Sequence, residues 1–512
     1  MTEGTRRQDL LLVCLSAVFL LLELVPSIID GYGYFIDELY YIACSARPSL
    51  GYVDHPPLAP LLLRLSRALL GDSLPAIRFL PALAGAASVY LTGLMARRMG
   101  AGMFGQAVAA IALMAAPIPL LLFGFYSMNA FELLLWVAAS YVLVQLARTG
   151  NERLWLVFGL VAGIGLENKH TFVLLAAGLA VGLLLTPARR HLTSKWLWLG
   201  AAVALLLFLP NLWWQIQNGW PSLEFYRNAD LHKNVATPPL QVLFDQVLLM
   251  GPGSLPIWIA GLFFCLRSRA GRPYRFLGWM FVALLLLMVV GQKSRPDRIA
   301  GAYPVIFAAG GAWWSTAVAR RALRWARWAL PALLALFALL LAPLSLPLLP
   351  PEQLARYSAA TGIVPQIEAG AGKVSELPQW FADRFGWQEL VDEVAEVVAG
   401  LEPGESERAL ILVPSYGHAG ALELLGADRG LPRVASPQNT YHLWGVGEEA
   451  IDVVVSVGFG PESLSELFDE VEQVSVYRCG YCMSWRDNMP IYVARGPKVR
   501  FQEAWPRFKH YV

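Results

Sequence analysis

Charged residues are scarce in this chain. Asp, Glu, Lys and Arg together make up 15% of its 512 residues, whereas 56% are hydrophobic. A water-soluble chain of this length cannot bury so large an apolar excess. The composition therefore excludes an ordinary soluble protein and predicts an integral membrane protein.

Signs of a nucleotide or nucleic-acid partner are also missing. The formal net charge is only +2, and no basic block is interleaved with aromatic residues as in a strand-binding groove. The C-terminal part contains neither a Gly-x-Gly-x-x-Gly pattern nor a phosphate loop. We therefore expect no nucleic-acid partner, and a nucleotide site in that part has no sequence support.

Cysteine is sparse as well, with five residues in the whole chain. Only Cys479 and Cys482, in "RCGYCM", are close enough in sequence to suggest a pair. An oxidising compartment permits a disulfide there, and free thiols are the alternative.

Long hydrophobic runs, by contrast, are abundant. A membrane crossing needs about 20 residues of helix, and about eleven runs of this kind are counted with a hydropathy window. They lie at 9–29, 78–96, 103–123, 129–147, 153–167, 171–187, 196–216, 245–265, 275–291, 302–318 and 328–348. Arginine-rich connections such as 97–98, 189–190 and 320–327 fall on one side in this order, which predicts a cytoplasmic N-terminus. An odd number of crossings then places residues after 350 outside.

The chain changes character near "LPLLPPEQ", residues 346–353. We predict a transmembrane domain at 1–350 and an extracytoplasmic soluble α/β domain at 351–512. Within the second domain, "RALILVPS" and "IDVVVSVG" are typical of buried strands, and "SLSELFDEVEQV" (463–474) predicts an amphipathic helix.

Two acid-bearing stretches follow the first hydrophobic run and face outward by this topology. "GYFIDELYY" (33–41) carries Asp37 and Glu38, and "GYVDHPPLAPLLLRLSRALL" (51–70) carries Asp54 and His55. Their aromatic content and the amphipathic pattern after His55 predict interfacial helices at the headgroup level. Solvated surface acids are the alternative interpretation.

Such carboxylates suit a reaction in which a hydroxyl attacks an activated anomeric carbon. One carboxylate accepts the proton, and cations or a metal ion receive the departing phosphate. Adjacent helix residues point about 100° apart, so Asp37 and Glu38 cannot contact the same atom. We expect one to be the base and the other to orient it.

Several motifs together carry a family resemblance. They are the "DE" pair at 37–38, "VDHPPL" (53–58), "GLVAGIGLENK" (159–169), "LPNLWWQIQNGWP" (209–221) and "YHLWG" (441–445). The chain resembles bacterial family-39-type glycosyltransferases of the GT-C superfamily, relatives of protein O-mannosyltransferases and of the aminoarabinose transferase that modifies lipid A. The resemblance implies an inverting transferase of the bacterial inner membrane. Its donor would be a polyprenyl-phosphate sugar, and its acceptor a lipid, glycan or protein hydroxyl reached among membrane lipids on the outer face.

The resemblance also implies residue roles. Asp37 matches the catalytic acid and is expected to be the general base, with Glu38 as its partner. Asp54 is expected to bind a divalent metal ion, and His55 to bind either that metal or the donor phosphate, because it replaces a common Lys. The simple alternative for His55 is a cap on the Pro-Pro turn.

Three cations are candidates for the donor phosphate: Lys169 in "GLENKH", and Lys293 and Arg298 in "GQKSRPDRIAG". Interfacial anchoring explains them equally well. A second acid is common on the next outer loop of the family. Here Asn129 occupies that position and Glu132 follows one helical turn later, where it could simply complement the helix dipole.

Two other classes remain open. A transporter or flippase of a lipid-linked sugar would place polar residues near the bilayer midplane, often at broken helices. A receptor-like protein whose external tail binds a partner leaves the acids at 37–54 without a role. The clustering of acids at one outer edge favours surface chemistry over both.

Overall fold

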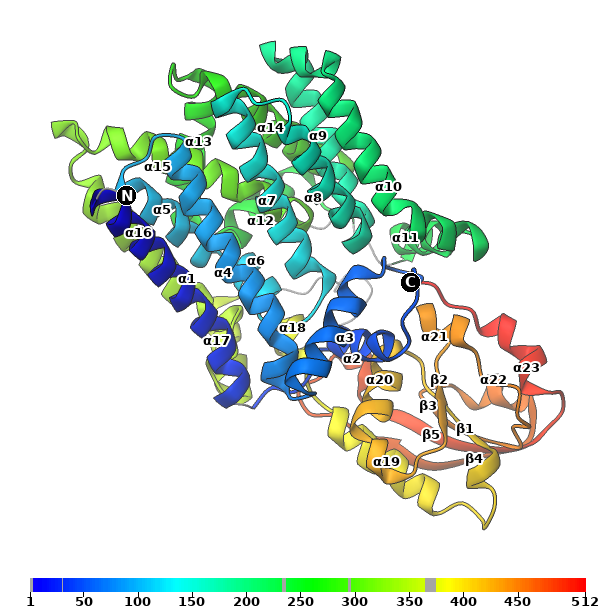
Figure 1. Cartoon of the computed structure of the whole chain (residues 1–512). Coiled ribbons are helices and arrows are strands. Elements are labelled where there is room, and N and C mark those ends of the chain that lie inside the picture. The colour runs from blue at the N-terminus through cyan, green and yellow to red at the C-terminus, as the bar shows by residue number, and fades with distance from the viewer. Residues whose placement is uncertain (1–2, 30, 233–235, 293–295, 364–373) are drawn as a thin grey trace.

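The computed structural model describes residues 3–29, 31–232, 236–292, 296–363 and 374–512. A large helical part is followed by a smaller domain that contains a β-sheet (Figure 1). The helices of the first part are α1 (Glu3–Ile29), α2 (Ile36–Ala46), α3 (Leu58–Leu70), α4 (Leu74–Arg98), α5 (Met103–Met114), α6 (Pro117–Phe123), α7 (Met128–Thr149), α8 (Leu154–Asn168), α9 (Val173–Leu184), α10 (Lys195–Gln217), α11 (Pro221–His232), α12 (Pro239–Leu249), α13 (Leu255–Arg267), α14 (Arg275–Gly291), α15 (Tyr303–Ala317), α16 (Ala326–Leu341) and α17 (Pro351–Thr361).

Helices long and apolar enough to cross a membrane confirm a polytopic protein, but they do not confirm eleven crossings. Over the described ranges there are six, or up to nine if each bent pair of helices is one span. The predicted run at 245–265 is broken, because α12 and the segment from Pro252 to Arg267 meet at 88°. The run at 153–167 corresponds to α8, whose 15 residues are short for a hydrocarbon core of about 30 Å.

Glycines bring several of these helices into direct backbone contact. A Cβ atom at Gly105 of α5 would lie 2.2 Å from the carbonyl oxygen of Gly311 in α15. At Gly159 of α8 it would lie 2.0 Å from the carbonyl oxygen of Gly200 in α10. Small residues at such crossings allow close helix packing where lipid removes the hydrophobic driving force.

The helix α3 is amphipathic along its whole length. Leu61, Leu65 and Leu69 form an exposed apolar stripe at intervals of four residues, and Leu65 is 56% exposed. On the other side, Arg64 and Arg67 donate hydrogen bonds to the carbonyl oxygens of Ser45 and Ile42 in α2. This pattern suits a helix that lies in the membrane interface and carries α2 on its polar side.

The C-terminal domain has the predicted α/β character. Its helices are α18 (Gln379–Ala382), α19 (Trp387–Ala399), α20 (Tyr416–Leu425), α21 (Asn439–Trp444), α22 (Pro461–Ser465) and α23 (Phe501–Ala504). Its strands, β1 (Ala409–Leu412), β2 (Arg433–Ala435), β3 (Val453–Val457), β4 (Phe468–Tyr477) and β5 (Met489–Pro497), form one sheet in the order β2-β1-β3-β5-β4. The pairs β1–β2 and β1–β3 are parallel, and the other two pairs are antiparallel.

The buried strands predicted at 408–415 and 451–458 are confirmed as β1 and β3. The helix predicted at 463–474 is wrong over most of its length. The helix α22 ends at Ser465, and the residues from Phe468 onward form the edge strand β4. Antiparallel pairing with β5 and the valines at 471, 474 and 476 favour the strand over the weak helical pattern.

The C-terminal domain packs directly on the segment that leads into α2. The backbone N–H of Ile36 donates to the carbonyl oxygen of Asp383 at 3.1 Å, and the indole N–H of Trp387 donates to the carbonyl oxygen of Tyr34 at 2.9 Å. The Tyr32 ring lies 5.2 Å from the rings of both Phe381 and Phe385. The start of α2 is therefore held by residues some 350 positions later in the sequence.

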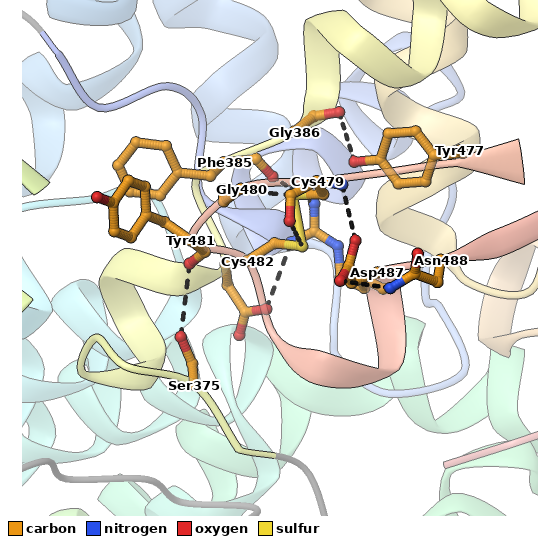
Figure 2. Close-up of a disulfide and its surroundings, with 12 residues drawn as sticks. Ser375, Phe385, Gly386, Tyr477, Cys479, Gly480, Tyr481, Cys482, Asp487 and Asn488 are labelled. Atoms are coloured by element: carbon orange, nitrogen blue, oxygen red, sulfur yellow. Dashed lines mark hydrogen bonds and ion pairs between the residues drawn. A yellow bond between two sulfur atoms is a disulfide. The ribbon is translucent and has the colours of Figure 1, made fainter.

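Cys479 and Cys482 form a disulfide in the turn between β4 and β5 (Figure 2). In the same turn, Arg486 donates to the carbonyl oxygen of Phe385 at 2.6 Å, and its guanidinium lies 3.5 Å from the centre of the Trp387 ring. Tyr477 donates to the carbonyl oxygen of Gly386 at 2.7 Å. This turn therefore supports the segment 383–387 that contacts residues 32–36.

The arginine-rich loops lie at the other end of the helical part. The N-terminus is remote from the C-terminal domain (Figure 1), and Arg97, at the end of α4, donates to Asp9 near the start of α1 at 2.7 Å. The two ends of the helical bundle thus differ in kind: one carries cationic loops, and the other carries the acid-bearing segments and the sheet domain.

Candidate active site

The first turn of α2 presents Asp37 and Glu38 to different neighbours. Phe35 is the N-cap residue, and its backbone N–H donates to Glu38 Oε2 at 2.9 Å, as the third residue of a capping box does. Asp37 lies next to it in sequence and points away from this contact by about one-quarter of a helical turn. Each carboxylate must therefore be considered separately.

Glu38 is completely buried and forms a two-pronged ion pair. Arg78 of α4 donates from Nε to Oε1 and from Nη2 to Oε2, each at 2.8 Å, and the backbone N–H of Tyr126 adds a bond of 2.9 Å to Oε1. Burial alone raises the pKa of Glu38, but the Arg78 guanidinium outweighs it, so the pKa lies below its usual range. These contacts anchor α2 to α4. The role predicted for Glu38, orienting the base, stays a prediction.

Asp37 is only half-buried and faces the C-terminal domain. Its Oδ1 accepts a hydrogen bond of 2.9 Å from the hydroxyl of Tyr416 at the start of α20. Burial raises the pKa of the neighbouring Tyr41 hydroxyl, and the charges of Asp54 and Asp37 raise it further. Asp37 and Asp54 therefore both lie close to Tyr41.

Asp54 and His55 occupy the turn before α3, and they differ in surroundings. Asp54 is half-buried and accepts from the Tyr40 hydroxyl at 2.7 Å. His55 is fully buried, with ring centres of Tyr41 and Tyr52 each at 4.8 Å. Its Nδ1 lies 2.9 Å from the carbonyl oxygen of Pro56, so Nδ1 carries the proton, and Nε2 faces the Cys44 sulfur at 3.9 Å. The turn-stabilising alternative for His55 fits this geometry.

A metal site at Asp54 and His55 needs further ligands. Within the described residues, no group of three or more His, Cys, Asp or Glu side chains is arranged to hold a metal ion. The imidazole is also enclosed by aromatic rings rather than turned toward Asp54. These side chains alone do not fit a metal centre, and the divalent ion stays a prediction.

Lys169 and Glu132 form an ion pair at the end of the helical part where α7 begins. The Lys169 ammonium lies 2.7 Å from Glu132 Oε2 and 2.7 Å from Asn129 Oδ1, and the Thr171 hydroxyl donates to Glu132 Oε1 at 2.6 Å. Asn129 and Glu132 also line a small pocket together with Asp297 and Arg298. Lys293 lies outside the described residues.

A tyrosine connects this pocket with the acid-bearing turn. Burial raises the pKa of Tyr226 in α11; the charges of Glu132 and Asp54 raise it further, and that of Arg298 lowers it. The charges of Asp54, Glu132 and Arg298 therefore all act on Tyr226. Sequence reasoning underrated Glu132, although an acid inside the apolar run "AFELLLW" was the available signal.

The motif "YHLWG" is also part of this region. Thr440, which precedes it in α21, has its hydroxyl 2.6 Å from that of Tyr40 and accepts from the backbone N–H of Val53 at 3.0 Å. The C-terminal domain thus contacts both acid-bearing stretches, at Tyr416 and at Thr440. Sequence reasoning did not identify either residue, because each is near the acids only in three dimensions.

Comparisons with known proteins agree with this architecture. Residues 54–214 match the family described as dolichyl-phosphate-mannose-protein mannosyltransferase. Lipid A galacturonosyltransferase RgtD of Rhizobium johnstonii is 26% identical over 53% of this chain and 58% of its own length. Lipopolysaccharide core galacturonosyltransferase RgtB of the same organism is 27% identical over 51% and 52%. The matches thus span little more than half the length of these curated relatives.

The fold match extends over nearly the whole chain. The crystal structure of ArnT from Cupriavidus metallidurans bound to undecaprenyl phosphate superposes with a TM-score of 0.58 at 15% identity. That superposition covers 94% of this chain and 97% of ArnT. The chain therefore shares its overall fold, a helical membrane part followed by a small sheet domain, with this glycosyltransferase-family structure of ArnT.

Proposed function

We propose that this protein is a membrane glycosyltransferase that moves a sugar from a polyprenyl-phosphate donor to an acceptor hydroxyl on the extracytoplasmic face. One observation carries the proposal: Asp37, Asp54 and the small pocket with Glu132 and Arg298 lie at the end of the helical bundle that the C-terminal domain contacts, and Lys169 binds the pocket residue Glu132. Acids that were merely solvated at the surface would not need hydrogen-bond partners such as Tyr416 for Asp37 and Tyr40 for Asp54.

Asp37 acts as the general base in the proposed reaction. The acceptor oxygen attacks the anomeric carbon while its proton passes to the Asp37 carboxylate. The bond between that carbon and the phosphate oxygen breaks, and polyprenyl phosphate leaves with the electron pair. Attack opposite the leaving group inverts the anomeric configuration. A positioned base of this kind contributes about 10²- to 10⁴-fold to a rate.

Lys169 and Arg298 receive the donor phosphate. An ammonium group has three N–H donors, and Asn129 and Glu132 accept two of those on Lys169. The third is assigned to a phosphate oxygen, while Arg298, which lines the same pocket as Asn129 and Glu132, supplies a second cation. No step is assigned to a metal ion or to His55, whose ring is enclosed by tyrosines.

The cationic loops support the proposed orientation. They lie at the end remote from the acids, and positively charged loops prefer the cytoplasmic side. The proposed orientation therefore has the N-terminus in the cytoplasm of a bacterial cell, and Asp37 and the C-terminal domain outside its inner membrane.

The names of the similar proteins suggest the class of donor and acceptor. RgtD acts on lipid A and RgtB on the lipopolysaccharide core, both as galacturonosyltransferases, and ArnT binds undecaprenyl phosphate. We therefore infer an undecaprenyl-type donor phosphate and a lipid-linked saccharide as acceptor.

Purified protein incubated with a radiolabelled polyprenyl-phosphate sugar and a lipid A acceptor tests the proposal. We expect label to move to the acceptor together with release of polyprenyl phosphate. In proteoliposomes, movement of intact donor across the bilayer without cleavage would instead identify a flippase, and neither event with any saccharide acceptor would reject both functions.

A further inference from the structure

The helix α20 of the C-terminal domain packs against α2 at van der Waals distance. A Cβ atom at Gly420 would lie 2.7 Å from the carbonyl oxygen of Leu39, and one at Gly417 would lie 2.2 Å from Cγ1 of Ile36. Only residues without a side chain permit this approach. It brings Tyr416, the first residue of α20, to the turn of α2 that carries Asp37.

Tyr416 is fixed on two sides at this point. Its hydroxyl donates to Asp37 Oδ1 at 2.9 Å, and its ring stacks on the Tyr40 ring with centres 4.5 Å apart and an interplanar angle of 27°. The Tyr40 hydroxyl in turn donates to Asp54 Oδ1 at 2.7 Å, since a carboxylate can only accept. Two stacked tyrosines thus each bind one of the two half-buried acids.

We propose that Tyr416 is a positioning residue for the general base, so that the C-terminal domain completes the active site. This inference rests on the proposed function. The hydroxyl of Tyr416 holds one oxygen of the Asp37 carboxylate and so limits rotation of the group. The stack on Tyr40 prevents the phenol from moving away. The carboxylate is thereby set at a fixed angle toward the incoming acceptor hydroxyl.

The same hydrogen bond favours the ionised form of Asp37, because it is donated to the charged state. The other titratable groups beside this carboxylate include Tyr41 on α2 and Asp54 on the turn before α3. An ionised Asp54 raises the electrostatic cost of a negative charge at Asp37, whereas the Tyr41 phenol is neutral. Tyr416 offsets that cost.

Tyr416→Phe is the informative variant, because it removes the hydroxyl and leaves the stacking ring. We expect kcat to fall by roughly tenfold, in line with the loss of a hydrogen bond to a charged group, while KM for the donor and the thermal midpoint stay unchanged. The acidic limb of the pH–kcat profile should move to higher pH, because Asp37 then binds its proton more tightly.

Tyr492→Phe is the matched control in the same domain. The hydroxyl of Tyr492, on β5, donates to Gln473 Oε1 at 3.3 Å within the sheet, so this variant should keep wild-type kcat and pH profile. Equal losses in the two variants would show a merely structural effect and overturn the inference.

Asp37→Asn separates this inference from the proposed function. If Asp37→Asn abolishes transfer and Tyr416→Phe turns over normally, Asp37 stays the base and the role of Tyr416 is wrong. If Asp37→Asn itself turns over normally, the base assignment fails and the role of Tyr416 fails with it. In the Asp37→Asn background, adding Tyr416→Phe should cause no further loss.

Discussion

On one side of the first turn of α2, Glu38 is enclosed by Arg78 and by backbone N–H groups and has no exposed surface. On the neighbouring side, Asp37 is half-buried and meets the phenol of Tyr416. The two adjacent carboxylates therefore contact different parts of the chain: an arginine of the membrane part binds Glu38, and a tyrosine of the C-terminal domain donates a hydrogen bond to Asp37.

This difference separates anchoring from chemistry. A carboxylate neutralised by a bidentate guanidinium is a poor proton acceptor, because its charge is already satisfied. A phenol donor lowers the proton affinity of a carboxylate less than a bidentate guanidinium does. The same helix turn can thus be fixed in the membrane part through Glu38 and still offer Asp37 for the proposed role of base.

The substitution Asp37→Asn removes the proposed base and should have the largest effect on transfer activity. We expect transfer to fall by at least about 100-fold, the lower end for loss of a general base, with donor binding and thermal midpoint nearly unchanged. Radiolabel transfer and donor binding, measured on the same preparation, check this. Near-normal turnover would reject Asp37 as the base.

The substitution Glu38→Gln removes the ion pair with Arg78 that anchors α2 to α4. Removing one partner of a buried ion pair leaves Arg78 uncompensated and should cost about 3 kcal/mol of stability. The thermal midpoint in detergent should drop clearly, and transfer should fall only as far as folded protein is lost. The double variant Glu38→Gln/Arg78→Met should recover part of the stability, and a double variant less stable than Glu38→Gln alone would contradict the pairing.

The stability that the Glu38–Arg78 pair contributes should depend on pH. The pKa of Glu38 is lowered in the folded protein from a reference of 4.5, so its contribution to stability is complete above that reference value and is lost as the pH falls through the folded pKa. Below pH 4.5 the wild type should lose stability more steeply than Glu38→Gln/Arg78→Met. Thermal midpoints of both proteins as a function of pH measure this, and parallel curves would show that the pair does not stay ionised.

The Lys169–Glu132 ion pair is less buried than the Glu38–Arg78 pair. Its side chains are 13% and 11% exposed, against 2% and 0% for Arg78 and Glu38. Glu132→Gln should therefore destabilise by only about 1.5 kcal/mol, near the low end for a hydrogen bond to a charged group. The midpoint shift of Glu132→Gln should be smaller than that of Glu38→Gln, and the reverse order would refute the ranking by burial.

Much of the architecture could be predicted from the sequence because its signals are local. Long apolar runs gave the membrane helices, short continuous apolar runs gave β1 and β3, and the position of the acids relative to the first run gave the end of the bundle on which Asp37 lies. The errors are also local in origin. The broken run at 245–265 and the strand β4 were misassigned because bends and edge pairing depend on neighbours that a sequence window does not contain.

The partners of the acids could not be predicted in the same way. Arg78 is 40 residues from Glu38, and Tyr416 is 379 residues from Asp37. No local pattern encodes contacts over such separations. His55 illustrates the same limit, since its sequence position matched a ligand site while the surrounding tyrosine rings enclose it.

The docking of Ile36 on Asp383 has a consequence for biosynthesis. A ribosome makes the segment before Asp37 early and its supports at Asp383, Trp387 and Tyr416 only near the end of translation. During most of synthesis α1 is therefore complete while the turn that carries Asp37 still lacks these contacts. The turn gains its full set of supports only when the C-terminal domain has been made and has folded onto residues 32–36.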